Sequence, residues 1–124
     1  MIFLNRIGPS YVIKQKDFFS NVKIDKNMTL EEAIKSKPTV VVEFFASWCP
    51  HCQRMMPIVE QIRELLDGKV DIYQLDIEEN EQAAKASGAE SVPTFIVFRD
   101  GREVWRQSGE MDADYLLGHI EKYV

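Results

Sequence analysis

The sequence predicts an α/β domain in which a mixed central β-sheet is flanked by helices on both faces and preceded by an N-terminal extension. Three observations support this fold class. Residues 39–45 are β-branched or aromatic at nearly every position, which is typical of a central strand buried on both faces. Strand and helix patterns alternate from there to residue 88, as in a parallel crossover. Asp100-Gly101 then separates two β-rich runs and predicts a type I′ hairpin, which makes the second half of the sheet antiparallel.

The extension is assigned to residues 1–28 and the main domain to residues 29–124. Within the extension, residues 11–13 are compatible with a short strand, and residues 18–24 are expected to contain the first strand of the main sheet. Thr29 and Glu32 have the spacing of a capping box, which predicts a short helix that ends at Pro38.

The remaining elements are recognised from apolar periodicity, from helix caps and from glycine stop signals at residues 68 and 88. They are the central strand over 39–45, the longest helix over 50–66, a strand over 70–75, a helix over 81–87 capped by Asn80, hairpin strands over 94–98 and 103–107, and an amphipathic helix that begins near Asp112. Met55 and Met56 are assigned to core packing of the longest helix rather than to copper binding.

Composition excludes several classes of protein. The 124 residues fit one domain, and 15 basic against 20 acidic residues give a net charge of −5, so nucleic acid is not an expected partner. The longest apolar stretch is interrupted by Glu43, so no membrane span is expected. The N-terminus has no export-signal pattern, which favours a cytoplasmic location, with the periplasm or another exported compartment as the alternative if a signal has been removed. We expect a monomer.

The two cysteines of the chain, Cys49 and Cys52, form a Cys-Pro-His-Cys motif between the buried strand and the longest helix. A pair at this spacing beside a βαβ pattern indicates redox chemistry. Cys49 is expected to be exposed at the helix start, where free backbone amides and the helix dipole favour a thiolate, so it is the expected nucleophile. Cys52 lies one turn further on and is the expected resolving thiol. Pro50 suits the first helical position, and the imidazole of His51 can donate to the Cys49 thiolate.

Two other interpretations of the cysteine pair are a structural disulfide and half of a metal site. A structural zinc site needs four ligands, and only His51 and His119 could join the cysteines. His119 is expected on the surface of the last helix, where it complements the helix dipole. We therefore expect no metal and no cofactor other than the Cys49–Cys52 disulfide itself.

Together these motifs resemble the thioredoxin family: residues 41–52 with the cysteine pair, Pro57, Val92-Pro93-Thr94, Asp100-Gly101 and Gly109. The resemblance extends from about residue 29 to the C-terminus. It implies a thioredoxin fold, exchange with disulfides of protein substrates, and a separate reductase or oxidase that recycles the pair. It also implies a cis peptide before Pro93 and substrate pairing at the Val92 backbone. The expected substrate surface consists of Trp48, Pro50, Val92, Pro93 and Gly109, although Trp48 is also compatible with simple core packing.

The chain departs from the family pattern at three positions. Pro50-His51 replaces the usual Gly-Pro and occurs also in bacterial periplasmic disulfide oxidases, which leaves the direction of electron flow open. Glu43 replaces a buried aspartate, and Gln74 replaces a lysine that commonly pairs with it. Glu43 is either paired with a basic side chain or is a buried proton relay for Cys52, and burial without a cation would raise its pKa.

The sequence thus predicts a disulfide reductase with a relatively oxidising potential, in which Cys49, Cys52, Glu43 and His51 carry the chemistry. Within the same enzyme class, an oxidase or isomerase uses the same residues. From a different class, the alternative is a binding module in which the cysteines are idle.

Overall fold

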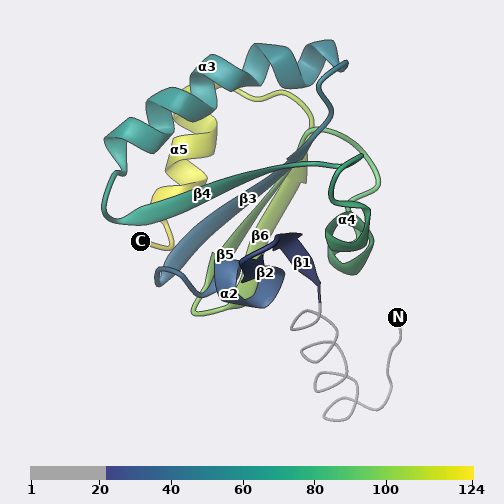
Figure 1. Ribbon diagram of the computed structural model, residues 1–124. Helices are drawn as coiled ribbons and strands as arrows, with labels where there is room; N and C mark the ends of the chain where they lie inside the picture. Colours follow the sequence, from purple (N-terminus) through teal and green to yellow (C-terminus); the bar gives the residue numbers. More distant parts are fainter. Residues whose placement is uncertain (1–21) are drawn as a thin grey trace, which may run out of the picture.

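The structure is a computed structural model that describes residues 22–124 (Figure 1). Its centre is a four-stranded sheet in the order β4-β3-β5-β6. The strands are β3 (Thr39–Phe45), β4 (Val70–Asp76), β5 (Thr94–Arg99) and β6 (Arg102–Ser108). β3 pairs parallel to β4 and antiparallel to β5, and β5 pairs antiparallel to β6. The mixed sheet predicted from the sequence is confirmed.

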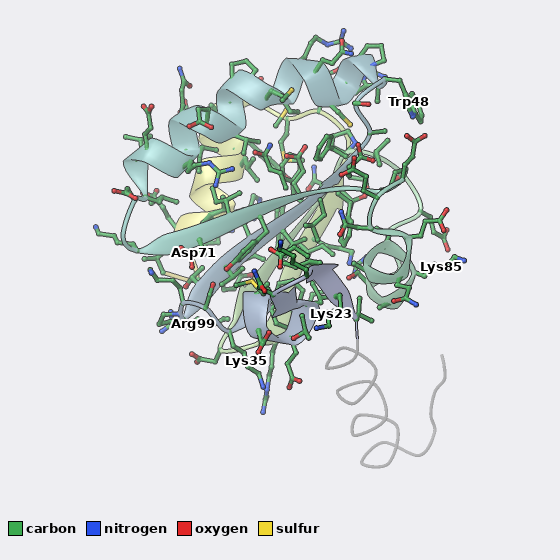
Figure 2. All side chains as sticks on the ribbon, viewed as in Figure 1. Lys23, Lys35, Trp48, Asp71, Lys85 and Arg99 are labelled. Atoms are coloured by element: carbon green, nitrogen blue, oxygen red, sulfur yellow. The ribbon has the colours of Figure 1, made fainter. Side chains whose placement is uncertain are left out.

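Two helices cover each face of this sheet, as predicted (Figure 1). On one face lie α2 (Leu30–Ile34) and α4 (Glu81–Ser87), and on the other lie α3 (Pro50–Leu65) and α5 (Ala113–Glu121). The side chains fill the space between the sheet and both pairs of helices (Figure 2). The start of α3 lies at the edge marked by Trp48, far from the opposite end of the sheet, where Arg99 and Asp71 are found (Figure 2).

The strand β3 explains how one sheet supports two cores. Val40, Val42 and Phe44 pack into the core under α2 and α4, whereas Val41 packs into the core under α3 and α5. Successive side chains of a strand point to opposite faces, so Glu43 shares the face of Val41. The buried carboxyl group of Glu43 therefore lies on the same side of the sheet as α3, the helix that begins beside the cysteines.

The N-terminal part differs from the prediction. β1 (Lys23–Asp25) does not join the main sheet but pairs antiparallel with β2 (Met28–Thr29) in a separate two-stranded sheet. A tight turn accounts for this, since the Asp25 carboxylate accepts a hydrogen bond from the Asn27 N–H at 2.6 Å and folds the chain back at once. The strand expected at residues 11–13, and the first residues of the one expected at 18–24, lie outside the described residues.

Local signals in the sequence had mixed outcomes. The capping box is confirmed, because the Glu32 N–H donates to Thr29 Oγ1 at 3.1 Å and the Thr29 N–H donates to Glu32 Oε1 at 2.9 Å. Asn80 and Asp112 do occupy N-cap positions, but neither side chain makes a capping hydrogen bond. The type I′ hairpin is confirmed by φ angles of 53° at Asp100 and 81° at Gly101.

Two expectations about packing are wrong. Met55 is buried, but Met56 is 52% exposed, because adjacent helical residues point about 100° apart and cannot both face the core. His119 is not a simple surface residue, since its half-buried ring stacks on Trp105 at a centroid distance of 4.6 Å. Among residues 22–124, none of the helices is long and apolar enough to cross a membrane.

Candidate active site

The cysteine pair lies where β3 leaves the sheet and α3 begins. Cys49 is the N-cap residue of α3, with an extended backbone, and Pro50 occupies the first turn. The Cys49 N–H donates to the Ala46 carbonyl at 3.1 Å, and the Cys49 carbonyl accepts from the Gln53 N–H at 3.0 Å. Both cysteines are free thiols. The helix start thus directs the first unpaired amides of α3 at Cys49, as its sequence position predicts.

The two thiols differ in acidity. The pKa of Cys49 is lowered, chiefly because the backbone N–H of Cys52 donates to its sulfur, with further donation from the Cys52 thiol and the His51 N–H and attraction by the charge of Arg54. Burial raises the pKa of Cys52 to about 11, and the charges of Cys49 and Glu43 add to this effect. Of the two thiols, Cys49 is therefore the one that ionises more readily, and Cys52 keeps its proton at neutral pH.

The exposure of the two sulfur-bearing residues differs less than the sequence suggests. We expected Cys49 to be exposed at the helix start, but it is only 4% exposed, against 2% for Cys52. Cys49 is covered because it packs in a small cluster with Ala46 and the half-buried Val92. The distinction between a nucleophilic and a resolving cysteine therefore depends on electrostatics more than on accessible area.

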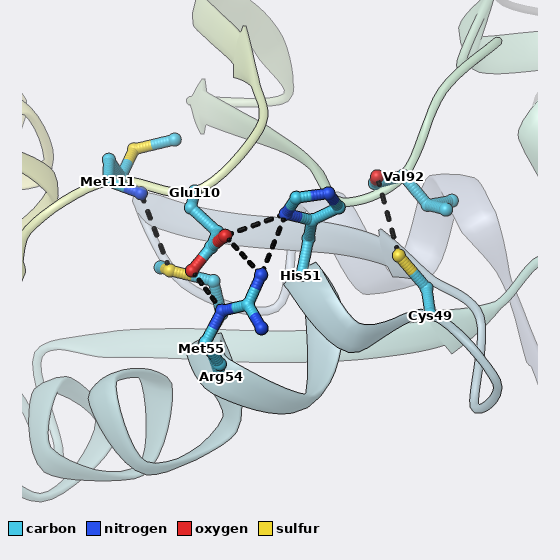
Figure 3. A network of polar contacts seen from close by, with 7 residues as sticks. All are labelled: Cys49, His51, Arg54, Met55, Val92, Glu110 and Met111. Carbon is cyan, nitrogen blue, oxygen red and sulfur yellow. Dashed lines mark hydrogen bonds and ion pairs between the residues drawn. The ribbon is translucent and has the colours of Figure 1, made fainter.

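A loop from the other half of the sheet lies against Cys49. The Val92–Pro93 peptide bond is cis, as the family resemblance implies. The thiol of Cys49 points at the Val92 carbonyl, with Sγ and O 4.0 Å apart (Figure 3). The Gly109 N–H donates to the Pro93 carbonyl at 2.8 Å, which fixes the end of β6 beside this loop. The structure thus brings Val92, Pro93 and Gly109 together next to the cysteines.

Beside Val92 the surface forms a groove of about 390 Å³ that is bounded by Trp48 and by residues of α4 and the loop after it. Trp48 is 61% exposed, and its Nε1–H donates to Glu78 Oε2 at 3.2 Å. Core packing does not explain an indole with this exposure. Pro50, in the first turn of α3, is also exposed.

Glu43 lies in a chain of polar contacts beneath α3. Its Oε1 accepts from Gln74 Nε2 at 2.9 Å, and Gln74 Oε1 accepts from Arg63 Nη2 at 2.8 Å. Glu43 and Gln74 are direct neighbours in the β3–β4 register, so the sheet holds this contact in place. Arg63 therefore does not contact the Glu43 carboxyl group directly, because the Gln74 side chain lies between them. Burial therefore outweighs the hydrogen bond and the distant charge, and the pKa of Glu43 rises from 4.5 to about 7.

This raised pKa predicts a pH-dependent stability. Because the native state keeps the Glu43 proton that the unfolded chain loses, the contribution of Glu43 to stability is greatest below about pH 4.5 and is lost as the pH rises through about 7. The full loss is about 3 kcal/mol. Glu43→Gln has no proton to lose at this position, so it lacks this pH-dependent loss. Between pH 4.5 and pH 8, the free energy of unfolding of Glu43→Gln, measured with urea, should therefore rise by about 3 kcal/mol relative to that of the native protein. A constant difference between the two proteins would contradict the raised pKa.

The imidazole of His51 does not make the expected contact with Cys49. Its Nδ1 lies 2.6 Å from Glu110 Oε1 and 3.2 Å from Arg54 Nη2 (Figure 3). Only the backbone N–H of His51 acts on the Cys49 sulfur. The physical reason is that a carboxylate within reach is a stronger partner for the imidazole than a sulfur atom on the other side of the helix start.

The sequence did not identify Arg54 and Glu110 as parts of the site. Arg54 lies three residues after His51 on α3, a spacing that places both side chains on one helix face, and this was the available signal. For Glu110, only its position after Gly109 in the sequence pointed to the site. Across residues 22–124, no group of three or more His, Cys, Asp or Glu side chains is placed to hold a metal ion.

Comparison with known proteins identifies the family that this site resembles. The sequence model of the thioredoxin family matches residues 20–122. The chain is 33% identical over 94 residues to a thioredoxin from Synechocystis and spans 88% of that protein. It is 37% identical over 87 residues to the chloroplastic thioredoxin Y of rice, but it spans only 52% of that protein and 70% of its own length aligns.

The fold is likewise similar to a solved structure. A thioredoxin variant from Halobacterium salinarum superposes with a TM-score of 0.70 at 34% sequence identity, over 76% of this chain and 81% of that one. The thioredoxin fold that the motifs imply is therefore confirmed.

Proposed function

The chain belongs to the thioredoxin family, and we propose that it is a thiol–disulfide oxidoreductase that reduces disulfide bonds in other proteins. The observation that carries this proposal is the opposite shift of the two thiols at the start of α3. Cys49 has a lowered pKa, whereas that of Cys52 is raised to about 11. A structural disulfide has no need of such a difference, but an exchange reaction needs one thiol that attacks and another that waits.

The reaction proceeds in two exchange steps. The Cys49 thiolate attacks one sulfur of a substrate disulfide, the substrate S–S bond breaks, and one substrate thiolate leaves while a mixed disulfide forms at Cys49. The Cys52 thiol then gives up its proton and attacks Cys49 Sγ, which releases the second substrate thiolate and forms the Cys49–Cys52 disulfide. Two electrons pass from the dithiol to the substrate.

Glu43 takes the proton from Cys52 in the second step. A carboxyl group with a pKa of about 7 is ionised often enough at neutral pH to accept a proton and releases it readily afterwards. The charge of Glu43 already acts on the Cys52 thiol, which places the two groups within electrostatic reach. The hydrogen bond from Gln74 orients the carboxyl group without neutralising it.

The substrate chain docks on the surface around Val92. Trp48 and Pro50 flank Cys49 in the sequence, and Gly109 is hydrogen-bonded to Pro93. The groove beside Trp48 gives an apolar side chain of the substrate a place to bind. The Val92 carbonyl lies 4.0 Å from Cys49 Sγ, so a substrate backbone that pairs with Val92 lies beside the reacting sulfur. The Cys49–Cys52 disulfide is the sole redox group, and a separate reductase recycles it.

The redox potential tests the direction of electron flow. The amides of α3, the Cys52 thiol and the charge of Arg54 stabilise the Cys49 thiolate, and the disulfide form has no such anion to stabilise. We therefore expect a potential between about −270 mV and about −120 mV, the values for thioredoxin and the bacterial periplasmic oxidase. Equilibration against a glutathione series measures it. A value at or below that of thioredoxin would contradict the oxidising poise.

A disulfide oxidase or isomerase is the second candidate, and the Pro50-His51 dipeptide favours it. A potential close to −120 mV would support this alternative over the reductase. A reductase works where its dithiol is regenerated, which requires a reducing compartment. The cytoplasmic location and the monomeric state stay predictions.

A further inference from the structure

The cluster formed by His51, Arg54 and Glu110 is the least explained part of the site. Glu110 Oε2 accepts from Arg54 Nε at 2.8 Å, and Glu110 Oε1 accepts from Arg54 Nη2, also at 2.8 Å. The same Oε1 lies 2.6 Å from His51 Nδ1 (Figure 3). One carboxylate thus binds the guanidinium group through two hydrogen bonds and the imidazole through a third.

The fold delivers Glu110 to this place from a distant part of the sequence. On one side of it, the Gly109 N–H donates to the Pro93 carbonyl at 2.8 Å. On the other side, the Met111 N–H contacts Met55 Sδ at 3.5 Å (Figure 3). The backbone around Glu110 is therefore tied both to the loop that faces Cys49 and to α3. These two main-chain contacts fix the position from which the Glu110 side chain extends.

The cluster lies close enough to Cys49 to affect its charge. The positive charge of Arg54 lowers the pKa of Cys49, and the Cys49 thiolate in turn raises the pKa of Arg54. Glu110 competes for the same guanidinium group, and the pKa of Glu110 falls to about 2 because of its hydrogen bonds to Arg54 and His51. The carboxylate is thus ionised throughout the neutral range and offsets the positive charge of Arg54, the cation that acts on Cys49.

We propose that Glu110 is a positioning residue that holds Arg54 in a charge-compensated cluster with His51 and so limits how strongly Arg54 stabilises the Cys49 thiolate. This inference rests on the proposed function, because it assigns to Glu110 the tuning of the same cysteine pair. The consequence is that Glu110 keeps the pair more reducing than its helix start and the charge of Arg54 alone would make it. A single surface carboxylate then sets part of the redox potential.

The test removes the charge of Glu110 and keeps its shape. Glu110→Gln still presents a carbonyl oxygen to Arg54, but it leaves the charge of Arg54 uncompensated. Arg54→Gln removes the cation instead, and the double variant removes both. Glu64→Gln is the matched control, because Glu64 is exposed on the same helix near its far end. Each protein is equilibrated with reduced and oxidised glutathione at pH 8, and the fraction of Cys49–Cys52 disulfide is measured.

We expect Glu110→Gln to shift the equilibrium constant with glutathione about two- to fivefold toward the dithiol. The pH profile of Cys49 alkylation should move to lower pH in the same variant. Arg54→Gln should shift both readouts the opposite way, the double variant should return toward the native values, and Glu64→Gln should leave them in place. An unchanged equilibrium in Glu110→Gln, or a shift toward the disulfide, would overturn the proposal.

The two hypotheses fail in different ways. The glutathione equilibrium requires only that Cys49 and Cys52 form a disulfide, so it reports on Glu110 even if the protein does not reduce substrate proteins. If the proposed function is wrong, the native protein fails to reduce a protein disulfide. If only the role of Glu110 is wrong, the native protein remains active, and Glu110→Gln has the same potential as Glu64→Gln.

Discussion

Replacing Cys49 with serine is expected to reduce disulfide exchange to the uncatalysed rate, whereas replacing Cys52 with serine is expected to trap substrates as mixed disulfides. The reason is the order of the two steps. Without Cys49 no thiolate of lowered pKa is available to attack, because the pKa of the remaining Cys52 is raised to about 11. Without Cys52 the first step proceeds, but no second thiol is present to release the substrate.

The measurement combines a rate with a product analysis. Thiol release from a protein disulfide substrate gives the rate, and gel electrophoresis without reductant followed by mass spectrometry identifies the mixed disulfides. The double variant Cys49→Ser/Cys52→Ser is the control for non-covalent association and should trap nothing. If the Cys49→Ser protein were the one that accumulated covalent adducts, the roles of the two cysteines would be reversed.

The same proteins distinguish an enzyme from a binding module. In a module that only docks partners, the cysteines have no reason to differ in acidity, and alkylation of the native protein would show two ordinary thiols. The structure favours the enzyme because three donors, two amides and the Cys52 thiol, act on the Cys49 sulfur. A native protein without an acidic thiol would favour the module.

Patterns that are local in sequence predicted most of the fold. The apolar run of β3, the capping box at Thr29 and the Asp100-Gly101 turn each depend on neighbouring residues, and each formed as expected. The sequence placed the first strand in the main sheet, which is wrong. The turn at Asp25 folds the chain back so that β1 pairs with β2 instead. Apolar content alone does not specify which strand pairs with which.

The candidate site divides in the same way. The cysteine motif lies within one helix turn, so the sequence specified its geometry almost completely. The burial of Cys49 and the contact between His51 and Glu110 depend on segments that are more than 40 residues apart in sequence. Side-chain contacts between such distant segments depend on the three-dimensional arrangement of the sheet and helices, and no motif in this sequence predicts them. The sequence showed that Gln74 replaces a lysine, but only the structure showed that Arg63 donates a hydrogen bond to Gln74.

Glu43 is the buried group whose loss should slow the reaction most selectively. Glu43 is 1% exposed as a residue, and its carboxyl group has a pKa of about 7, raised by burial. At pH 7 the Cys52 thiol, with a pKa of about 11, is almost entirely protonated and needs a base before it can attack. A positioned base typically contributes a factor of about 10² to 10⁴ to such a step.

We therefore expect Glu43→Gln and Glu43→Ala to slow the release of a substrate from Cys49 by about 100-fold or more, while the first attack by Cys49 keeps its rate. The second step is isolated by preparing the mixed disulfide between Cys49 and a chromophoric thiol and following the release of that thiol. In the native protein this rate should rise with pH up to about 7, as Glu43 ionises, and then level off. The two variants should lack this rise.

Glu79→Gln is a suitable control, because Glu79 is exposed in the turn after β4 and its loss removes the same charge from the chain. It should leave both steps unchanged. Comparing the two Glu43 variants separates proton transfer from packing, since glutamine keeps the volume and the contact with Gln74, whereas alanine leaves a cavity. Slow release in both variants with a native rate of first attack would identify Glu43 as the base. Equal slowing of both steps, or slowing in the alanine variant alone, would show that Glu43 only supports the fold beneath α3.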